Sequence, residues 1–160
     1  TLCVAYYNEY KIKSIIVRPG HVYGPTATIE DNRAATQFFH DVVSGHDIIM
    51  KSSGQQLRSY CYVIDCVSAI ISVLLNGEIC HSYNIANPIS NVSIKELAEC
   101  IANESGKNIL FQLASEKEKS GYNLMENSCL DASELIKLGW KGLFDLKTGV
   151  RHTLQIMNSL

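Results

Sequence analysis

The fold of this chain is decided by the stretch Ser14-Ile-Ile-Val-Arg-Pro-Gly-His-Val-Tyr-Gly-Pro25. Residues 14–18 form an apolar run closed by Pro19, which is typical of a short strand buried on both faces of a parallel sheet. The two glycines and two prolines of residues 19–25 leave little room for regular structure, so we expect a shaped loop. Ligands of open α/β sheets bind at the carboxyl ends of the strands, which makes this loop a candidate binding site.

The composition describes one domain and argues against several classes of protein. The chain has 160 residues, of which 46% are apolar and 19% charged, enough for a real core. Its 14 basic residues are dispersed and the formal net charge is -2, so we expect no nucleic-acid partner. The longest apolar stretches fall far short of the roughly 20 residues that span a bilayer. We expect no membrane segment and, without a secretory signal in the chain, a cytoplasmic protein.

The six cysteines predict no metal site. They show no Cys-x-x-Cys pair and no Cys/His cluster at zinc spacing. Most of them sit in apolar periodic runs, where a reduced thiol behaves as a small apolar side chain. We therefore expect reduced thiols without a chemical role at Cys3, Cys61, Cys66, Cys80, Cys100 and Cys129.

The opening residues have the apolar spacing of a helix, at Leu2, Ala5 and Tyr6. No N-cap or turn residue precedes them, and the first residue is Thr1 rather than Met. This beginning resembles the second half of a helix. We therefore expect the chain to be a fragment of a longer protein.

The rest of the chain alternates extended and helical patterns, which predicts a mixed α/β unit. Further strands are expected at residues 48–50, 57–63, 82–86 and 109–113. The helices between and after them are expected to begin at Asp31, Asp65, Asp131 and Asp145, and at the capping box Ser93-Ile-Lys-Glu96. The polar stretch 114–128 is expected to be a loop and a candidate lid.

Three side chains are candidates for chemistry on the residues alone. Arg58 follows a Gly-containing turn, and its guanidinium can bind phosphate oxygens through two parallel hydrogen bonds. His21 lies in the 19–25 loop and can donate or accept a hydrogen bond near neutral pH. Arg33 lies in the first turn of its helix, where a cation opposes the helix dipole unless an anion is near. A solvated or structural role stays open for each, and is expected for His40, His46, His81 and His152.

Four segments in register resemble the carboxyl-terminal half of the extended short-chain dehydrogenase/reductase family, the NAD-dependent nucleotide-sugar epimerases, dehydratases and decarboxylases. Residues 18–25 resemble the family's R-P-x-N-V-Y-G-P, and residues 54–65 resemble G-x-x-x-R-[DS]-[FYW]-x-Y-V-x-D. Residues 83–88 and 138–140 match later landmarks. Within the family, residues 31–38 and the region of Arg58 most resemble the UDP-glucuronate decarboxylase branch, with dTDP-glucose 4,6-dehydratases and UDP-hexose 4-epimerases as close alternatives.

The resemblance implies the end of a Rossmann sheet followed by a small α/β substrate-binding domain over residues 1–160. The NAD-binding portion, with its glycine-rich loop and catalytic Tyr-x-x-x-Lys, would precede Thr1. NAD would then be bound mainly outside this chain, which would hold no catalytic residue and be inactive alone. The family oxidises the C4 hydroxyl of a nucleotide-diphosphate sugar, passes hydride to NAD, and continues by dehydration, decarboxylation or epimerisation.

The resemblance also implies roles for seven residues. The substrate-binding ones would be Arg58 at the diphosphate, Met50 at the nucleotide base, and His21. The cofactor would be bordered by Pro19, Gly20, Val22 and Arg33. Because His21 replaces an Asn of the family, and imidazole cannot match an amide's paired donor and acceptor, the identity of the sugar stays open.

The opening helix implies a homodimer, since its family counterpart packs against its twin in a second subunit. Leu2, Val4, Tyr6 and Tyr7 would suit that interface, although the same residues could instead pack within the missing domain. A catalytically inactive sugar-nucleotide-binding or scaffold protein of the same fold is the alternative function.

Overall fold

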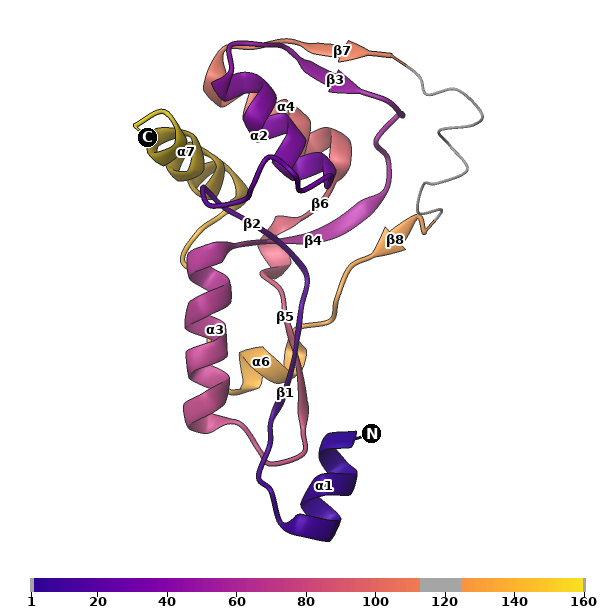
Figure 1. Cartoon of the computed structure of the whole chain (residues 1–160), viewed down its shortest axis with the longest axis vertical. Helices are drawn as coiled ribbons and strands as arrows, with labels where there is room; N and C mark the ends of the chain where they lie inside the picture. Colours follow the sequence, from indigo (N-terminus) through magenta and orange to yellow (C-terminus); the bar gives the residue numbers. More distant parts are fainter. Residues whose placement is uncertain (1, 113–124, 160) are drawn as a thin grey trace.

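The computed structural model describes residues 2–112 and 125–159. Figure 1 shows an elongated molecule, with α2, α4 and α7 at one end and α1 at the other. The helices are α1 (Leu2–Tyr10), α2 (Ala34–Val43), α3 (Val63–Asn76), α4 (Ile94–Ser105), α6 (Ser133–Lys137) and α7 (Leu146–Met157), with a 3-10 turn η1 (Pro88–Ser90). The strands are β1 (Ile16–Pro19), β2 (His21–Tyr23), β3 (Ile48–Met50), β4 (Leu57–Tyr62), β5 (Ser82–Ile85), β6 (Asn91–Ser93), β7 (Ile109–Phe111) and β8 (Asn127–Ser128).

The strands form three small sheets in which parallel pairing prevails. β1 pairs with β5, and β3 pairs with β7, both in parallel. The central sheet has the order β2-β4-β6, in which β2 is parallel and β6 antiparallel to β4, and β8 also pairs with β4. The predicted α/β class is therefore confirmed, as are the strands expected at residues 48–50 and 82–86, the latter shortened by one residue.

Two apolar cores hold the molecule together. The larger lies among α2, α4, α7 and the strands beside them, and its buried members include Phe39, Leu97 and Val150. The second joins α3 and α6 to β1 and β5 around Val73, Leu135 and Trp140. Cys61 and Cys66 are buried in or beside this second core as free thiols, in agreement with the reduced interior cysteines that were expected.

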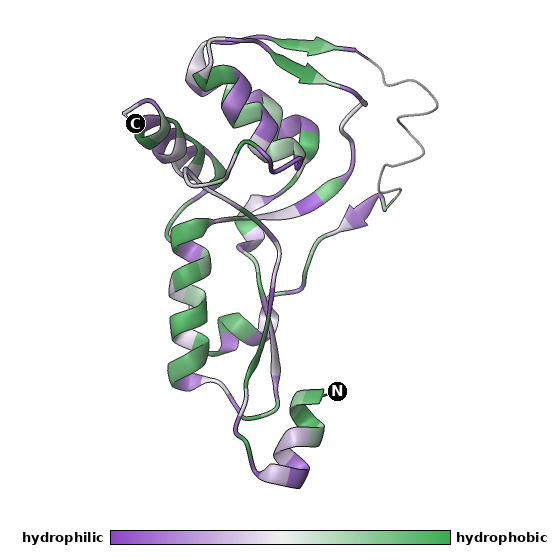
Figure 2. Cartoon of the chain, in the orientation of Figure 1, coloured by the Kyte–Doolittle hydropathy of each residue, from purple (hydrophilic) through white to green (hydrophobic). Residues whose placement is uncertain are grey.

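Helix α3 also carries apolar side chains on its outer face. Figure 2 shows α3 as hydrophobic along most of its length. Leu74 and Leu75 are 71% and 74% exposed, and Ile64, Val67 and Ile71 are exposed on earlier turns. Helix α1 has no buried residue at all. On α1 and on the outer face of α3, the lower part of the molecule therefore presents apolar side chains that have little cover among the described residues.

The prediction of an irregular loop at residues 19–25 is wrong in its middle. His21–Tyr23 form strand β2, which pairs with Tyr60–Tyr62 of β4. The two strands can approach at this point because Gly20 has no side chain: a Cβ there would lie 2.7 Å from the Ser59 carbonyl oxygen. The Gly that suggested a loop thus permits a close backbone approach between strands.

Two of the expected helix starts are confirmed. Ser93 accepts a hydrogen bond from the Glu96 amide while the Glu96 carboxylate accepts one from the Ser93 amide, which completes the capping box. Asp145 caps α7 by accepting from the Thr148 amide at 2.7 Å. Gly106 ends α4 with a φ of 68°, in the left-handed region that favours glycine.

The other three expected caps are wrong, because each aspartate has a different set of partners. Asp65 lies inside the first turn of α3, where it is fully buried and accepts hydrogen bonds from the Leu143 and Phe144 amides and from the Asn87 side chain. Helix α6 begins after Ala132, and helix α2 begins after Arg33 rather than Asp31. The buried Asp65 therefore fastens α3 to the segment before α7 instead of starting a helix.

The candidate lid lies mostly outside the described residues. Of the stretch 114–128, residues 125–128 are described, and they include β8 against β4.

None of the helices in the described ranges combines the length and apolarity that crossing a bilayer requires. Within the same ranges, no three His, Cys, Asp or Glu side chains gather as metal ligands.

Candidate functional site

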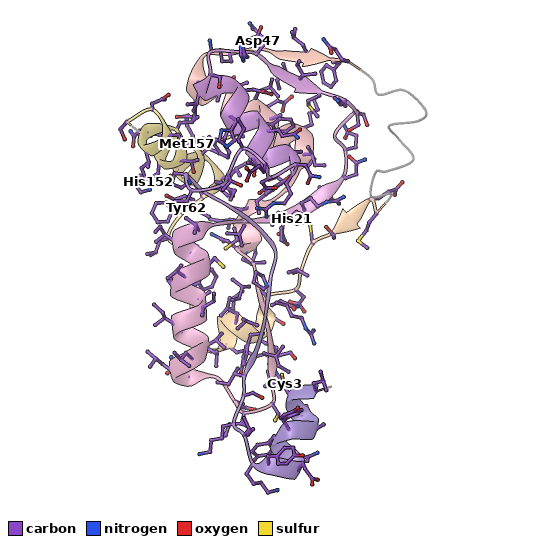
Figure 3. All side chains as sticks on the ribbon, viewed as in Figure 1. Cys3, His21, Asp47, Tyr62, His152 and Met157 are labelled. Carbon is purple, nitrogen blue, oxygen red and sulfur yellow. The ribbon has the colours of Figure 1, made fainter. Side chains whose placement is uncertain are left out.

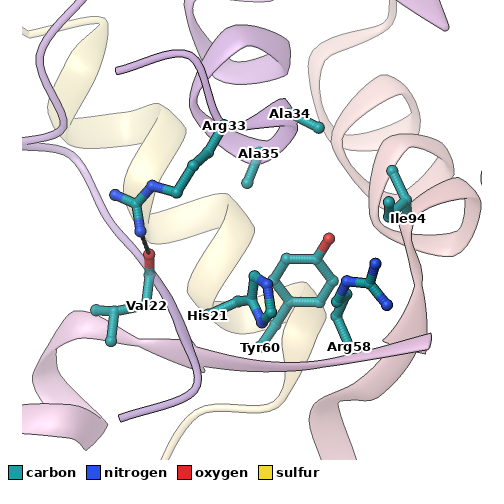
Figure 4. Close-up of a pocket in the computed structure, with 8 residues that line it drawn as sticks. All are labelled: His21, Val22, Arg33, Ala34, Ala35, Arg58, Tyr60 and Ile94. Atoms are coloured by element: carbon teal, nitrogen blue, oxygen red, sulfur yellow. Dashed lines mark hydrogen bonds between the residues drawn. The ribbon is translucent and has the colours of Figure 1, made fainter. Parts of the chain in front are cut away.

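A cavity of about 150 Å³ opens where β2 and β4 pass beneath the first turns of α2 and α4. Figure 4 shows His21, Tyr60 and Arg58 side by side at its floor, with Arg33 on the opposite wall and its guanidinium turned toward the Val22 carbonyl. Its lining residues are His21, Val22, Arg33, Ala34, Ala35, Arg58, Tyr60 and Ile94. The 19–25 segment and Arg58, which the sequence singled out separately, thus face one cavity.

A second hollow of about 510 Å³ adjoins the first and contains Met50. The two hollows share Arg33, Ala34, Arg58 and Ile94, so we treat them as one groove. The second hollow adds Asn32, Gln37, Phe38, Ile49, Met50, Lys51, Ser52 and Gln56. The groove therefore runs from the imidazole of His21 past Arg58 to the apolar side chain of Met50.

Arg58 is built firmly into the wall of the groove. Its side chain is only 5% exposed, and one Nη donates to the carbonyl of Leu57 at 2.8 Å. The other Nη donates to the carbonyl of Met125 at 2.9 Å. A guanidinium has five N–H donors, so the carbonyls fix its position while donors are left for a ligand. Such a fixed fork suits phosphate oxygens.

Arg33 has a protein anion as its partner. Its Nε donates to both oxygens of Asp31 at 2.9 Å, and one Nη donates to the Val22 carbonyl at 3.4 Å. These hydrogen bonds hold the pKa of Asp31 well below its ordinary value and raise the pKa of Arg33. The nearby anion that would relieve the conflict of Arg33 with the helix dipole is thus Asp31, and the placement of Arg33 in the first turn is wrong, because Arg33 is the N-cap of α2.

The environment of the groove shifts the pKa values of two of its side chains, His21 and Tyr60. Burial lowers the pKa of His21, and the neighbouring positive charges of Arg58 and Arg33 lower it further. Burial raises the pKa of Tyr60 to about 12, although Arg58 opposes that rise. Near neutral pH both side chains are therefore uncharged hydrogen-bonding groups.

The groove is electropositive. Its described lining includes Arg33, Lys51 and Arg58, and no carboxylate stands among those lining residues. Lining amides come from Asn32, Gln37 and Gln56, and the buried Gln56 Oε1 has no hydrogen-bond partner among the described residues. Such a lining suits a doubly charged anion attached to a group that needs both apolar contact and hydrogen bonds.

Of the residues expected to border NAD, the structure places two in the groove and two outside it. Val22 and Arg33 line the first cavity, whereas exposed Pro19 ends β1 and half-buried Gly20 follows it. The clash that a Cβ at Gly20 would meet involves the protein's own backbone, so this glycine does not form an open phosphate cradle. These four residues could therefore lie along one side of a bound dinucleotide, but they do not form a glycine-rich loop that could bind its diphosphate.

The sequence interpretation missed Tyr60, Ile94 and Lys51 as lining residues. Tyr60 could have been found, because side chains two apart on a strand share a face and Arg58 was already placed there. Ile94 enters the groove because β6 pairs antiparallel with β4, a contact that no pattern in the sequence predicts.

The remaining histidines lie outside the groove lining. Figure 3 shows His152 beside Tyr62, and the Tyr62 hydroxyl lies 2.7 Å from His152 Nδ1.

Tyr7 and Lys11 have the Tyr-x-x-x-Lys spacing, but they lie on and just after α1, at the far end of the molecule from the groove (Figure 1). They do not supply a proton-transferring pair to it.

Comparison with known proteins gives one family and a consistent set of relatives. A family model described as "NAD dependent epimerase/dehydratase family" matches residues 1–86. UDP-glucuronic acid decarboxylase 3 of Arabidopsis thaliana is 34% identical over 101 residues, which cover 63% of this chain and 29% of that protein. UDP-glucuronic acid decarboxylase 1 of Xenopus tropicalis is 25% identical over 154 residues, which cover 96% of this chain and 35% of that protein. The chain thus spans about a third of the length of these curated relatives.

The fold is shared with a solved structure. The crystal structure of UDP-glucuronic acid 4-epimerase from Bacillus cereus, in complex with UDP-glucuronic acid and NAD, matches with a TM-score of 0.81 at 19% identity. The match covers 99% of this chain and 49% of that chain. At this identity the likeness concerns the fold, and it agrees with the α/β architecture described above.

Proposed function

Because this chain belongs to the NAD dependent epimerase/dehydratase family, as its motifs predicted, we propose that it is the substrate-binding portion of an enzyme that modifies a nucleotide-diphosphate sugar. The observation that carries the proposal is the convergence of Arg58, His21 and Met50 on one electropositive groove. In this arrangement Arg58 binds the diphosphate, Met50 borders the base, and His21 hydrogen-bonds the sugar end.

The proposed reaction begins with oxidation of the C4 hydroxyl of the sugar, for which NAD supplies the hydride acceptor. Dehydration, decarboxylation or epimerisation then follows, and the names of the relatives favour a UDP-uronic acid as substrate. Val22 and Arg33 would border the cofactor from the groove, and Pro19 and Gly20 from the end of β1. The cofactor would be held mainly by polypeptide beyond these 160 residues, which would also provide the catalytic base.

Two features of the fold support the proposal that additional polypeptide packs against the lower part of the molecule. The β1–β5 sheet has only two strands among the described residues, whereas parallel sheets are normally covered on both faces. Helices α1 and α3 lie near that sheet (Figure 1), and both expose apolar side chains, such as Leu2 and Leu74. The 160 residues alone would therefore bind neither NAD nor substrate productively, and we propose that they are inactive by themselves.

The experiment is to incubate the full-length natural protein, with NAD, separately with UDP-glucuronate, UDP-glucose and dTDP-glucose, and to identify products by mass spectrometry and NMR. A pentose product identifies a decarboxylase, a 4-keto-6-deoxy sugar a dehydratase, and an inverted C4 an epimerase. Binding without any product would contradict the enzyme and support the alternative, a catalytically inactive binding protein of the same fold. Absence of binding to all three would contradict both.

The partner proposed for α1 is a second copy of the protein. Leu2 is 74% and Tyr6 50% exposed, and Val4 and Tyr10 are exposed on the same short helix. Sedimentation of the full-length protein should show a dimer that Tyr6→Glu weakens, whereas Lys147→Glu on distant α7 leaves it intact. An unchanged dimer in Tyr6→Glu would mean that α1 packs within its own polypeptide instead.

A further inference from the structure

His21 occupies an unusual electrostatic position in the groove. It faces Arg58 and Tyr60 of β4 on one side and Arg33, with its partner Asp31, on the other. The residue of α4 that lines the groove is Ile94, which is uncharged. The carboxylate of Asp65 on α3 accepts hydrogen bonds from the Asn87 side chain and from the Leu143 and Phe144 amides, so it is already paired with other groups. The imidazole therefore stands between two guanidinium groups, and the neighbouring carboxylate is already paired with one of them.

We propose that His21 takes up a proton when a diphosphate anion enters the groove, so that binding of a nucleotide-diphosphate sugar is coupled to protonation of this imidazole. The inference rests on the proposed function, since it assumes a diphosphate ligand beside Arg58. It assigns to His21 a role that the Asn of the resembling family cannot perform, because an amide does not titrate.

The direction of the coupling follows from the charges. In the free protein, burial and the charges of Arg58 and Arg33 hold the pKa of His21 below 6.5, so the ring is neutral at neutral pH. A bound diphosphate offsets those positive charges and attracts a proton, which raises the pKa of His21. The ligand therefore binds more tightly to the protonated form, and its affinity falls as pH rises through the pKa of the bound state.

The other groups of the groove do not titrate in the same range. The pKa of Tyr60 is raised to about 12, and the pKa of Asp31 is held below its ordinary value. Arginine stays charged at any pH of interest. Of His21 and the four groups named here, Tyr60, Asp31 and the two arginines, His21 is thus the one whose proton can be exchanged between about pH 5.5 and pH 8.

The probe is UDP-glucose, because neither phosphate of a diphosphate diester has the second ionisation near pH 6 that a terminal phosphate shows. Its binding to the full-length natural protein with NAD is measured by calorimetry from pH 5.5 to 8, in buffers of different ionisation enthalpy. We expect net proton uptake near neutral pH and an affinity about tenfold higher at the acid end, which corresponds to a rise of about one pKa unit.

The matched variants are His21→Asn and His46→Asn. His21→Asn should still bind UDP-glucose but without His21-linked proton uptake and with an affinity that no longer depends on pH. His46 is exposed on the turn after α2. His46→Asn should leave the proton uptake and the pH dependence of UDP-glucose affinity unchanged. The ¹³C-ε1 NMR signal of His21 should show its pKa rising on addition of UDP-glucose.

The outcomes separate this inference from the proposed function. If UDP-glucose does not bind, the same titration is run with UDP-glucuronate and dTDP-glucose, and no binding of any of the three at any pH would contradict the proposed function itself. Binding that is independent of pH and takes up no proton would overturn the inference and leave the proposed function standing. Proton uptake that persists in His21→Asn would also overturn it, because another group would then be responsible.

Discussion

His21 and Tyr60 are register partners across the parallel pair β2–β4, and their rings lie 5.8 Å apart with an angle of 59° between their planes. Side chains two positions apart on a strand point to the same face, so the pairing that places Tyr60 beside His21 also directs Arg58 into the same cavity. One backbone register thus assembles the imidazole, the phenol and the guanidinium of the groove.

Arg58 is expected to carry much of the affinity for the diphosphate. Arg58→Ala should weaken binding of UDP-glucose to the full-length protein by about 1.5–3 kcal/mol, the usual contribution of a charged hydrogen-bond partner. Arg58→Lys keeps the charge but loses the two-pronged fork, so its affinity should be intermediate. Calorimetry measures both.

The control for this substitution is Arg151→Ala. Arg151 is an exposed guanidinium on α7 that pairs with Glu104 at 2.8 Å, outside the groove. Arg151→Ala should therefore leave the affinity for UDP-glucose unchanged. An Arg58→Ala protein that unfolds cooperatively and still binds with native affinity would remove Arg58 from the site.

Gly20 is expected to tolerate no side chain. In Gly20→Ala the new Cβ would lie 2.7 Å from the Ser59 carbonyl oxygen, so β2 must shift away from β4 and His21 must move with it. We expect a loss of about 1–3 kcal/mol in the free energy of unfolding, together with weaker UDP-glucose binding. Gly45→Ala, at a φ of +86° with open space around it, should cost stability without affecting binding. Equal binding by both variants would contradict this reading of Gly20.

Asp65 should prove more important for stability than its position in a helix suggests. Asp65→Ala removes the acceptor of the Leu143 and Phe144 amides and one of the two acceptors of the Asn87 side-chain amide, at a cost of about 2–4 kcal/mol. Asp65→Asn keeps one acceptor oxygen and should cost less. Guanidinium unfolding measures both, and a cost no greater than that of Asp131→Ala, whose carboxylate bonds one exposed amide, would show the cluster to be unimportant.

Asp31 should contribute stability that depends on pH. Its carboxyl pKa is held below the ordinary value of 3.8 by the hydrogen bonds from Arg33, so the unfolded chain binds its proton more readily than the folded one. The contribution is therefore present above pH 3.8 and is lost as pH falls toward the folded-state pKa. Unfolding measured at several pH values should show a smaller acid-induced loss in Asp31→Asn than in the natural chain. An identical loss would mean that the Asp31–Arg33 pair adds no stability.

Much of the local structure could be predicted because its causes lie within a few residues. Ser93 and Glu96 satisfy each other's amides, Asp145 caps α7, and Gly106 ends α4, each as the sequence indicated. The cap predicted at Asp65 failed for the opposite reason, because its donors come from residues far along the sequence. The cap predicted at Asp31 failed although its partner is local, because its carboxylate accepts from the Arg33 side chain and amide and the helix begins only after Arg33.

The amino-acid sequence by itself determined the family, the α/β class and some of the residues that meet at the groove, His21, Arg33, Met50 and Arg58 among them, because strand periodicity, helix signals and the motifs around residues 18–25 and 54–65 are local patterns. Only the tertiary structure decided how those residues are placed. Strand register brought Tyr60 beside His21, antiparallel β6 brought Ile94 into the groove, and the Met125 carbonyl fixed Arg58. Such contacts depend on which distant segments pack together, and no single stretch of sequence specifies that.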